Sequence, residues 1–288
     1  MQREVEKRGQ RAYLLPSDEI SNTRLTSLLS GDAHFCIGDE RVVVDEISTI
    51  WWRRPSLAQT VLQERHGDVQ DDYINSNSKV TLRSTLVNHF NGRWISAPDA
   101  TERASDKLFQ LRCASQCGLR VPDTLISCDP VAVQRFYDFH DRNVIVKAPH
   151  NTGRRFLATR EFHVEDVTNE QLAVVPSMYQ ERIPGTRHLR VNCFGTDIRT
   201  ASIDTEELDW RPNINVPVTP YNLGPDVQKQ LLLLLETLGL AMGIMDLKIT
   251  PDGELVWFEV NPQGQFLFLE PLTHQGLLDL FTTFLLSE

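Results

Sequence analysis

The sequence has no hydrophobic run long enough to cross a membrane. Its most conspicuous apolar stretch, residues 231–235, lies inside a helical pattern, whereas a membrane-spanning helix needs about 20 apolar residues. The N-terminus begins MQREVEKRGQR and lacks the apolar segment of a secretory signal. We therefore expect a cytoplasmic protein with no membrane partner.

Cysteine and positive charge are also scarce. The five cysteines include no CxxC pair, which argues against a disulfide framework and fits a reducing compartment. Cys113 and Cys117 could supply two metal ligands, but a structural zinc site needs four; the alternative is that both are small buried apolar side chains. Lys and Arg number 29 against 39 Asp and Glu, a net charge of −10, so we expect no nucleic-acid partner.

Signature motifs of several enzyme classes are missing as well. The sequence contains no HExxH, GxSxG or GxxxxGK[ST] pattern, so zinc-protease, α/β-hydrolase and P-loop functions have no support. Arg53 and Arg54 follow two tryptophans and could form an aromatic, basic nucleic-acid surface. The acidic composition favours the alternative, a strand end that supports a domain interface or touches an acidic substrate.

Short apolar runs alternate with helical patterns along the 288 residues. This alternation is typical of an α/β (α+β) fold, and the length suggests about two domains. Pro98 marks the predicted boundary between residues 1–98 and residues 99–288. Asp99, with Glu102 three residues later, predicts a capping box that opens one long helix.

Residues 244–261 read IMDLKITPDGELVWFEVN. Two apolar runs around an Asp-Gly turn predict a β-hairpin. If the Asp-Gly pair forms a two-residue turn, Asp246 lies opposite Glu259. Asn261 then projects from the same face as Glu259, because side chains alternate along a strand.

These three oxygen-bearing side chains form a candidate magnesium site. Two facing carboxylates at ~5 Å repel each other unless one is protonated or a cation lies between them. Carboxylate and amide oxygens suit Mg²⁺, which keeps coordination positions for phosphate and water. The alternative is an exposed strand face on which both carboxylates are merely solvated. The apolar residues around Glu259 argue against this alternative, because exposed strands rarely carry so few polar residues.

Two lysines are candidate phosphate ligands. Lys147 ends the apolar run of residues 144–147, and Lys107 lies in the helix that Asp99 is expected to open. Each could be an ordinary surface lysine, but beside a magnesium site both suit phosphate as point charges. His150 could reach the same phosphate, and the alternative is a plain loop histidine.

A strand that leads into a tight break forms a candidate hinge. Residues 179–183 read YQERI and are followed by Pro184 and Gly185, so the backbone there could present N–H and C=O groups to a purine edge. Arg190 and Arg211 are candidates to stabilise charge on a transferring phosphoryl group. The alternative is that both arginines pair with surface acids.

Taken in order along the chain, these residues resemble the ATP-grasp ligases, and more narrowly the microviridin-type (graspetide) maturases of ribosomally made peptides. The narrower resemblance covers roughly residues 45–288. It rests on six segments: IWWRRP at 50–55, KLFQ at 107–110, GLRVPDTLIS at 118–127, LRV at 189–191, DWR at 209–211 and EVNPQGQFLFLE at 259–270.

The resemblance implies an architecture and a set of residue roles. An N-terminal pre-ATP-grasp α/β domain (1–98) would precede a two-lobed ATP-grasp domain (99–288), with a small lobe at about 120–182 and a hinge at about 180–187. The implied roles are ATP-phosphate binding by Lys107 and Lys147; adenine contact by Gln180, Glu181, Arg182 and Ile183; binding of two Mg²⁺ ions by Asp246, Glu259 and Asn261; and catalysis by Arg190 and Arg211, which would steady the γ-phosphate and an acyl phosphate.

Two positions depart from the family pattern. His188 stands where related ligases carry an acidic residue against the ribose, so the ribose contact is either lost or made by an imidazole. Lys248 stands where an apolar residue is expected, and it would either pair with Glu259 or weaken the metal site.

The function implied by the resemblance is ATP- and Mg²⁺-dependent ligation. A side-chain carboxylate would be activated as an acyl phosphate, and an amine or hydroxyl would then form an ω-amide or ω-ester crosslink. The partner would be a precursor peptide with a leader and an acidic core, and a homodimer is a candidate assembly. Two alternatives stay open: the same chemistry on free amino acids or small metabolites, and a catalytically inactive ATP-binding module.

Overall fold

The computed structural model describes residues 1–55, 68–148, 159–211, 213 and 215–287. The chain packs as two compact units, Met1–Asp99 with Leu278–Glu288 and Ala100–Leu277. The domain limits expected from the sequence stay a prediction. Among the described residues, no helix combines the length and the apolar character that a membrane span needs.

The first unit combines two small sheets with a long helix. An antiparallel sheet has the order β1-β2-β3, and β4 pairs in parallel with β5. Leu82 and Leu86 of α2 pack with Phe35 and Val42 of the first sheet in one apolar core. The elements are α1 (Gln2–Lys7), η1 (Ile20–Thr23), β1 (Thr26–Ser27), β2 (Ala33–Ile37), β3 (Glu40–Val43), η2 (Val44–Glu46), β4 (Thr49–Trp51), α2 (Asp68–His89), β5 (Arg93–Ile95) and α9 (Leu277–Leu286).

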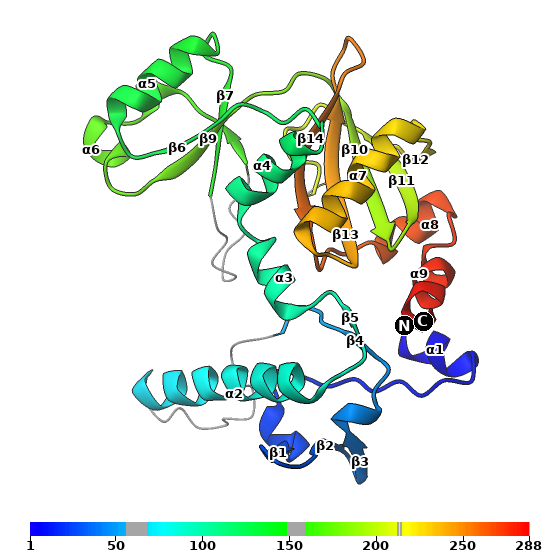
Figure 1. Ribbon diagram of the computed structural model, residues 1–288. Coiled ribbons are helices and arrows are strands. Elements are labelled where there is room, and N and C mark those ends of the chain that lie inside the picture. The colour runs from blue at the N-terminus through cyan, green and yellow to red at the C-terminus, as the bar shows by residue number, and fades with distance from the viewer. Residues whose placement is uncertain (56–67, 149–158, 212, 214, 288) are drawn as a thin grey trace. The chain divides into compact units, whose positions relative to one another are not determined.

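The chain termini lie side by side in this first unit (Figure 1). Arg8, just after α1, donates a hydrogen bond of 2.8 Å to the Thr283 hydroxyl in α9. The same guanidinium forms an ion pair with Asp279. The C-terminal helix therefore completes the N-terminal unit.

The segment after residue 98 forms two helices, so the single long helix expected there is wrong. Helix α3 (Pro98–Arg103) already contains Asp99, and α4 (Lys107–Gln116) begins after Asp106. The Asp106 carboxylate accepts a hydrogen bond of 3.0 Å from the Phe109 N–H. An N-cap residue takes an extended backbone and ends any preceding helix, so Lys107 becomes the first residue of a helix.

The first half of the second unit is a four-stranded antiparallel sheet of order β6-β9-β7-β8. Helix α5 begins after Asp129, whose carboxylate accepts a hydrogen bond of 3.0 Å from the Val131 N–H. The helix packs its Val133 and Tyr137 on the sheet. The elements are β6 (Thr124–Ser127), α5 (Pro130–Phe139), β7 (Val144–Lys147), β8 (Arg160–Glu161), η3 (Val164–Asp166), α6 (Asn169–Leu172) and β9 (Ser177–Glu181).

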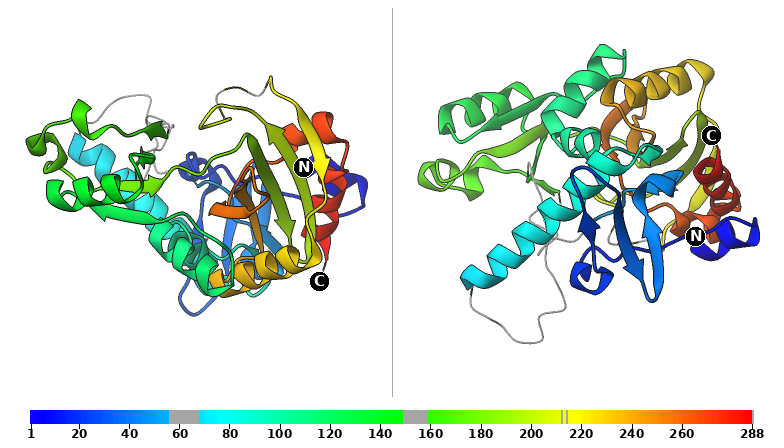
Figure 2. Two further views of the ribbon diagram at one scale, coloured as in Figure 1. Left: turned by 90° about the horizontal axis from the view of Figure 1, so that it is seen from above. Right: turned by 60° about the horizontal axis from the view of Figure 1, so that its bottom comes forward.

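The second half is a five-stranded antiparallel sheet of order β12-β11-β10-β13-β14. Helices α4 and α7 pack on one of its faces, and α7 lies along that face in Figures 1 and 2. Leu189 and Val191 of β10 face these helices, which leaves the alternate residues for the opposite face. The elements are β10 (Arg187–Phe194), β11 (Asp197–Asp204), β12 (Val218–Tyr221), α7 (Pro225–Leu238), β13 (Met242–Ile249), β14 (Leu255–Asn261), η4 (Leu267–Leu269) and α8 (Glu270–Thr273).

The β13–β14 hairpin confirms the predicted pairing of Asp246 with Glu259 but corrects the predicted turn. Thr250 N–H donates to the Glu254 carbonyl at 2.9 Å, so the loop has three residues rather than two. Its last residue, Gly253, has φ of +90°, a left-handed conformation that glycine adopts without strain. The register near the turn therefore differs by one residue from the prediction.

A β-bulge at Phe258 restores the register. Leu247 pairs with Trp257, whereas Asp246 pairs with Glu259, so Phe258 is the extra residue. Trp257 and Val260 both lie in the core under the helices, although they are three positions apart. The bulge is what allows Phe258 and Glu259 to face the opposite side together.

Candidate active site

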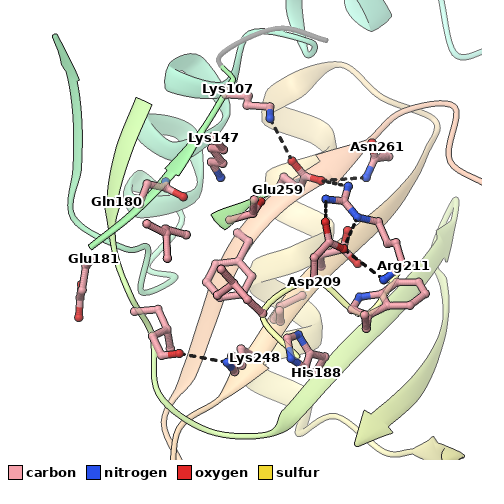
Figure 3. A pocket seen from close by; sticks show the side chains of 18 of the residues that line it. Lys107, Lys147, Gln180, Glu181, His188, Asp209, Arg211, Lys248, Glu259 and Asn261 are labelled. Carbon is pink, nitrogen blue, oxygen red and sulfur yellow. Dashed lines mark hydrogen bonds and ion pairs between the residues drawn. The ribbon is translucent and has the colours of Figure 1, made fainter. Parts of the chain in front are cut away.

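A cavity of about 1060 Å³, including its part open to solvent, lies between the two sheets of the second unit. Figure 3 shows how side chains from both sheets and from α4 converge on it. Arg182 and Arg190 are not among the lining residues. The other ten predicted site residues line this one cavity: Lys107, Lys147, Gln180, Glu181, Ile183, His188, Arg211, Asp246, Glu259 and Asn261.

The facing carboxylates are held by cations from the chain itself. One guanidinium nitrogen of Arg190, Nη1, donates to both oxygens of Asp246 at 2.9 and 2.8 Å. Nη2 of Arg190 donates to the Gln265 carbonyl at 3.1 Å. Burial raises the pKa of Asp246, although the ion pair with Arg190 opposes this shift. Arg190 thus acts as a buried partner of Asp246 and not as a cavity-lining residue.

Glu259 lies at the centre of a cationic cluster. Its carboxylate is 3.8 Å from Lys107 Nζ and 3.7 Å from Arg211 Nη1. The Asn261 side-chain amide donates to it at 3.5 Å, which leaves the Asn261 oxygen for a ligand. Burial alone would raise the pKa of Glu259, but Lys107, Lys147 and Arg211 hold it below its usual range.

Lys147 reaches the same cluster from the end of β7. Burial lowers the pKa of its ammonium from 10.5 to about 8, against the attraction of Glu259. Lys107, at the start of α4, donates at 3.3 Å to the carbonyl of Ala148. The two lysines therefore meet at one end of the cavity, as expected of a pair that shares one phosphate chain.

Asp209 is a site residue to which the sequence analysis assigned no role. Its carboxylate accepts two hydrogen bonds of 2.7 Å from Nε and Nη2 of Arg211, the fork geometry that fixes a guanidinium in one plane. Burial would lower the pKa of Arg211, but its contacts with Asp209 raise it above the usual value. The sequence feature that could have indicated this ion pair is an acid, Asp209, two positions before an arginine, Arg211.

The side chains of Gln180, Glu181 and Arg182 in the hinge point in different directions. Gln180 is buried and donates to the Thr124 hydroxyl at 2.8 Å. Glu181 turns to Arg120, at 2.9 Å, and Arg182 pairs with Glu161 at 3.0 Å. These three side chains are thus engaged with the protein. The backbone N–H groups of Glu181 and Arg182 are engaged as well, because they donate to the carbonyls of Asp123 and Asn143 at 3.0 and 2.9 Å.

His188 and Lys248, the two departures from the family pattern, lie opposite each other on β10 and β13. The Lys248 ammonium donates to the Ile183 carbonyl at 3.0 Å, and this bond, not the expected pairing with Glu259, is the one that the structure shows. Both side chains line the cavity. His150 lies outside the described residues.

The donor set has the chemistry of a magnesium site. Within the described parts of the chain, no cluster of three or more His, Cys, Asp or Glu side chains is placed to hold a metal ion, and Cys113 and Cys117 are buried thiols. Asp246, Glu259 and Asn261 supply oxygen donors only, which fits a hard cation whose remaining ligands are phosphate and water. Each carboxylate already has a cationic partner, so a metal ion has to compete with guanidinium and ammonium groups.

This arrangement of two sheets around a charged cavity is the ATP-grasp fold, and the whole chain shares it with solved ATP-grasp ligases. The macrocyclase MdnC of Microcystis aeruginosa MRC, bound with the precursor peptide MdnA, is 24% identical with a TM-score of 0.89, over 100% of this chain and 94% of that chain. A RiPP-associated ATP-grasp ligase of Chryseobacterium gregarium, in complex with ADP and a leader and core peptide, is 21% identical with a TM-score of 0.86, over 99% and 91%.

A third structure is similar over the same length. The macrocyclase MdnB of Microcystis aeruginosa MRC is 23% identical with a TM-score of 0.81, over 100% of this chain and 94% of that chain. No family model matches the sequence, and no curated protein matches it. At these identities the likeness establishes the fold, which confirms the expected ATP-grasp architecture.

Proposed function

We propose that the chain is an ATP- and Mg²⁺-dependent ligase that forms ω-ester or ω-amide crosslinks in a ribosomally synthesised precursor peptide. The observation that carries this proposal is the convergence of Lys107, Lys147 and Arg211 on Glu259 in one cavity. Such a cluster of cations around a carboxylate suits a polyphosphate with its divalent ion, because phosphate oxygens can pair with the cations and Mg²⁺ with the carboxylate.

The comparisons support the proposal that the chain binds a nucleotide and a precursor peptide. The Chryseobacterium ligase was solved with ADP and with leader and core peptides, and a related ligase, PsnB, with a minimal precursor, Mg and ADP. By analogy, Asp246, Glu259 and Asn261 would hold the metal, as two ions. When bound, Mg²⁺ supplies charge neutralisation at the transferring phosphoryl group.

The chain's own residues account for the remaining requirements. Lys107 and Lys147 would bind the phosphates, and the hinge backbone would orient the adenine. Arg211, held by Asp209, would face the γ-phosphate and the substrate carboxylate. Arg190 would act on this chemistry only through Asp246, which is a positioning role rather than the catalytic one expected from the sequence.

The reaction follows from the poor reactivity of a carboxylate. A side-chain carboxylate oxygen attacks the γ-phosphorus, the bond to ADP breaks, and an acyl phosphate forms. A hydroxyl or amine then attacks the acyl carbon, loses its proton, and displaces inorganic phosphate. The peptide loses one water for each crosslink, and one ATP becomes ADP and phosphate.

Mass spectrometry of a precursor peptide incubated with the protein, ATP and Mg²⁺ tests the proposal. An acidic core and a leader define the candidate peptides, and each crosslink should lower the peptide mass by about 18 Da with one ADP formed. A gain in peptide mass with a free amino acid present would instead support ligation of small molecules. ADP formation with no covalent product in either assay would contradict both.

One similar structure supports a second candidate function, the ligation of free amino acids or small metabolites. The D-cycloserine synthetase DcsG is 14% identical with a TM-score of 0.56, over 85% of this chain and 84% of that chain. This likeness is weaker than that to the peptide macrocyclases, so the peptide remains the preferred substrate. The homodimer stays a proposal, which the mass of the protein in solution tests.

A further inference from the structure

An ion pair between Arg120 and Glu181 joins the two halves of the second unit. We call the four-stranded sheet with α5 the small lobe, and the five-stranded sheet with α4 and α7 the large lobe. The chain crosses between the lobes twice, in residues 117–123 from α4 to β6 and in residues 182–186 from β9 to β10. Arg120 lies in the first crossing, and Glu181, the last residue of β9, directly precedes the second. Their side chains approach to 2.9 Å, so the two crossings are connected to each other.

The backbone of Arg120 is anchored on the large lobe. Its carbonyl accepts a hydrogen bond of 2.8 Å from the N–H of Trp257, a fully buried residue of β14. Arg120 also forms a parallel β-bridge with Val256, and the preceding residue, Leu119, lies in the apolar core of this lobe. The guanidinium of Arg120 is therefore attached to a fixed point on the large lobe.

The carboxylate of Glu181 is held on the small lobe. One of its oxygens accepts from Arg120, and the other accepts from the Asp123 N–H at 3.2 Å. The Glu181 N–H in turn donates to the Asp123 carbonyl at 3.0 Å. Figure 3 shows the Glu181 side chain pointing away from Lys147 and Glu259. This carboxylate therefore serves the contact between the lobes rather than the charged cluster.

Arg120 makes a second ion pair that does not cross between the lobes. Its Nη1 lies 2.9 Å from Glu254, just before β14, so both partners belong to the large lobe. The Glu254 side chain is 49% exposed, whereas that of Glu181 is 23% exposed. Water screens the more exposed pair more strongly. The pair with Glu181 is thus both the less exposed of the two and the one that connects the lobes.

The cavity takes its two walls from the two lobes. Lys147 and Gln180 line it from the small lobe, and Asp246 and Glu259 line it from the large lobe. A ligand that contacts both walls at once requires the lobes at one spacing. A small lobe that turned freely on its two crossings would offer this spacing for only part of the time, and the apparent affinity would fall by that fraction.

We infer, on the basis of the nucleotide binding proposed above, that Arg120 is a positioning residue for the nucleotide. Its ion pair with Glu181 holds the small lobe at the spacing at which Lys147 and Glu259 act on one phosphate chain. Among the described residues that line the cavity, Arg120 does not occur, so it acts through the position of the lobes and not by touching the nucleotide. Glu181 then has a role in place of the adenine contact that the family resemblance implies.

Calorimetric titration of the full chain with ATP in excess Mg²⁺ tests the inference. In R120M we expect the Kd for ATP to rise roughly 3- to 30-fold, because the competent spacing is populated less often. The number of binding sites per chain should stay the same, whereas a purely structural loss would reduce that number. E254Q removes the other partner of the same guanidinium and is the matched control; its Kd should change less than about twofold.

The outcomes separate the inference from the proposed function. If R120M binds ATP as tightly as the unmodified protein does, Arg120 has no positioning role, and the ligase proposal stands. Absence of ATP binding to the unmodified protein overturns both. An equal loss in E254Q and R120M would place the effect within the large lobe and would also overturn the inference.

A double-variant cycle tests the contact with Glu181 itself. E181Q should weaken ATP binding, and R120M/E181Q should bind about as weakly as R120M alone, because both substitutions act on one ion pair. If E181Q weakens binding and R120M does not, Glu181 contacts the nucleotide directly and the inference is wrong. Should R120M fail to fold, R120K takes its place, since its ammonium lacks the fork that spans two carboxylates. Unchanged affinity in both R120K and E181Q then overturns the inference.

Discussion

Arg190 holds both carboxylate oxygens of Asp246 through a single guanidinium nitrogen, and the two residues are direct partners across β10 and β13. Their side chains are only 7% and 13% exposed. Arg190 also lies over the ring of Trp210, 5.6 Å from its centroid. Asp246 therefore lines the cavity, and Arg190 holds its carboxylate from a buried position.

Removing one partner of this pair should destabilise the protein strongly. R190M leaves the Asp246 carboxylate buried without its cation, so we expect a loss of about 3–5 kcal/mol in the free energy of unfolding. Urea denaturation with an unchanged m-value measures it. The double variant R190M/D246L, which removes both charges, should recover part of the loss.

An exposed arginine on the same strand provides the control. Arg187 pairs with Asp204, and their side chains are 53% and 39% exposed. R187M should cost less than about 1 kcal/mol, because surface ion pairs are screened by water. Similar losses for R190M and R187M would show that burial of the Asp246 pair contributes nothing.

Glu259 is expected to be essential for catalysis but not for folding. E259Q keeps the size of the side chain and removes the charge that Lys107 and Arg211 face. We expect ATP-dependent crosslinking to fall by about 100-fold or more with little change in melting temperature. E254Q, on the same strand region but paired with Arg120, should retain activity; an active E259Q would remove Glu259 from the site.

The pH dependence of nucleotide binding should report Lys147. Its pKa is about 8, and the charged form is the one that binds phosphate, so the KM for ATP should rise as the pH increases above 8. In K147R the guanidinium stays charged, and the rise should disappear. Because the pKa of Lys248 is also about 8, a rise that persists in K147R would assign the titration to Lys248.

Gln110 should control the position of β14. Its side-chain amide donates to the Val260 carbonyl at 3.0 Å and accepts from the Val260 N–H at 2.9 Å. A side chain of α4 thus satisfies the backbone groups of the edge strand β14 between Glu259 and Asn261. Q110L leaves two buried backbone groups unpaired, and we expect a loss of about 2 kcal/mol or more in stability. The exposed Gln116 on the same helix supplies the control Q116L, which should cost less than about 0.5 kcal/mol in urea denaturation.

Asp209 should affect the reaction through Arg211. D209N removes the anion that fixes the guanidinium plane, so we expect crosslinking to slow about 10- to 100-fold with a smaller change in ATP affinity. Single-turnover assays separate the two effects. A loss confined to ATP affinity would place Arg211 on the nucleotide and not on the transferring group.

Local patterns in the sequence predicted most of the elements that carry the site. The β7 strand places Lys147 at its end, and the pairing of Asp246 with Glu259 is confirmed. The helix start was predicted at the wrong aspartate because Asp99 and Asp106 have the same capping chemistry, and only Asp106 takes the extended backbone of an N-cap. Neighbouring residues alone do not distinguish the two.

What the sequence could not reveal depends on contacts between distant segments. Arg190 was expected to steady the γ-phosphate and an acyl phosphate, and its ion pair with Asp246 on a neighbouring strand was not predicted. The bulge at Phe258 follows from the core, because Trp257 and Val260 must both reach the helices. Neither fact follows from periodicity along one segment, since each depends on which strands become neighbours.

The extra residue at Phe258 reverses the order in which side chains of β14 alternate between the two faces of the sheet. Before and after Phe258, successive side chains alternate between the two faces as in any strand. Across Phe258 this alternation is interrupted once, so the two stretches are out of step with each other. Shortening the strand by this one residue would bring them back into step. The acid and the tryptophan would keep their sides, and only the Phe258 side chain would leave the cavity wall. A regular strand that kept every residue and left the tryptophan in place would instead send a charge into the apolar layer and leave the cavity without its central anion.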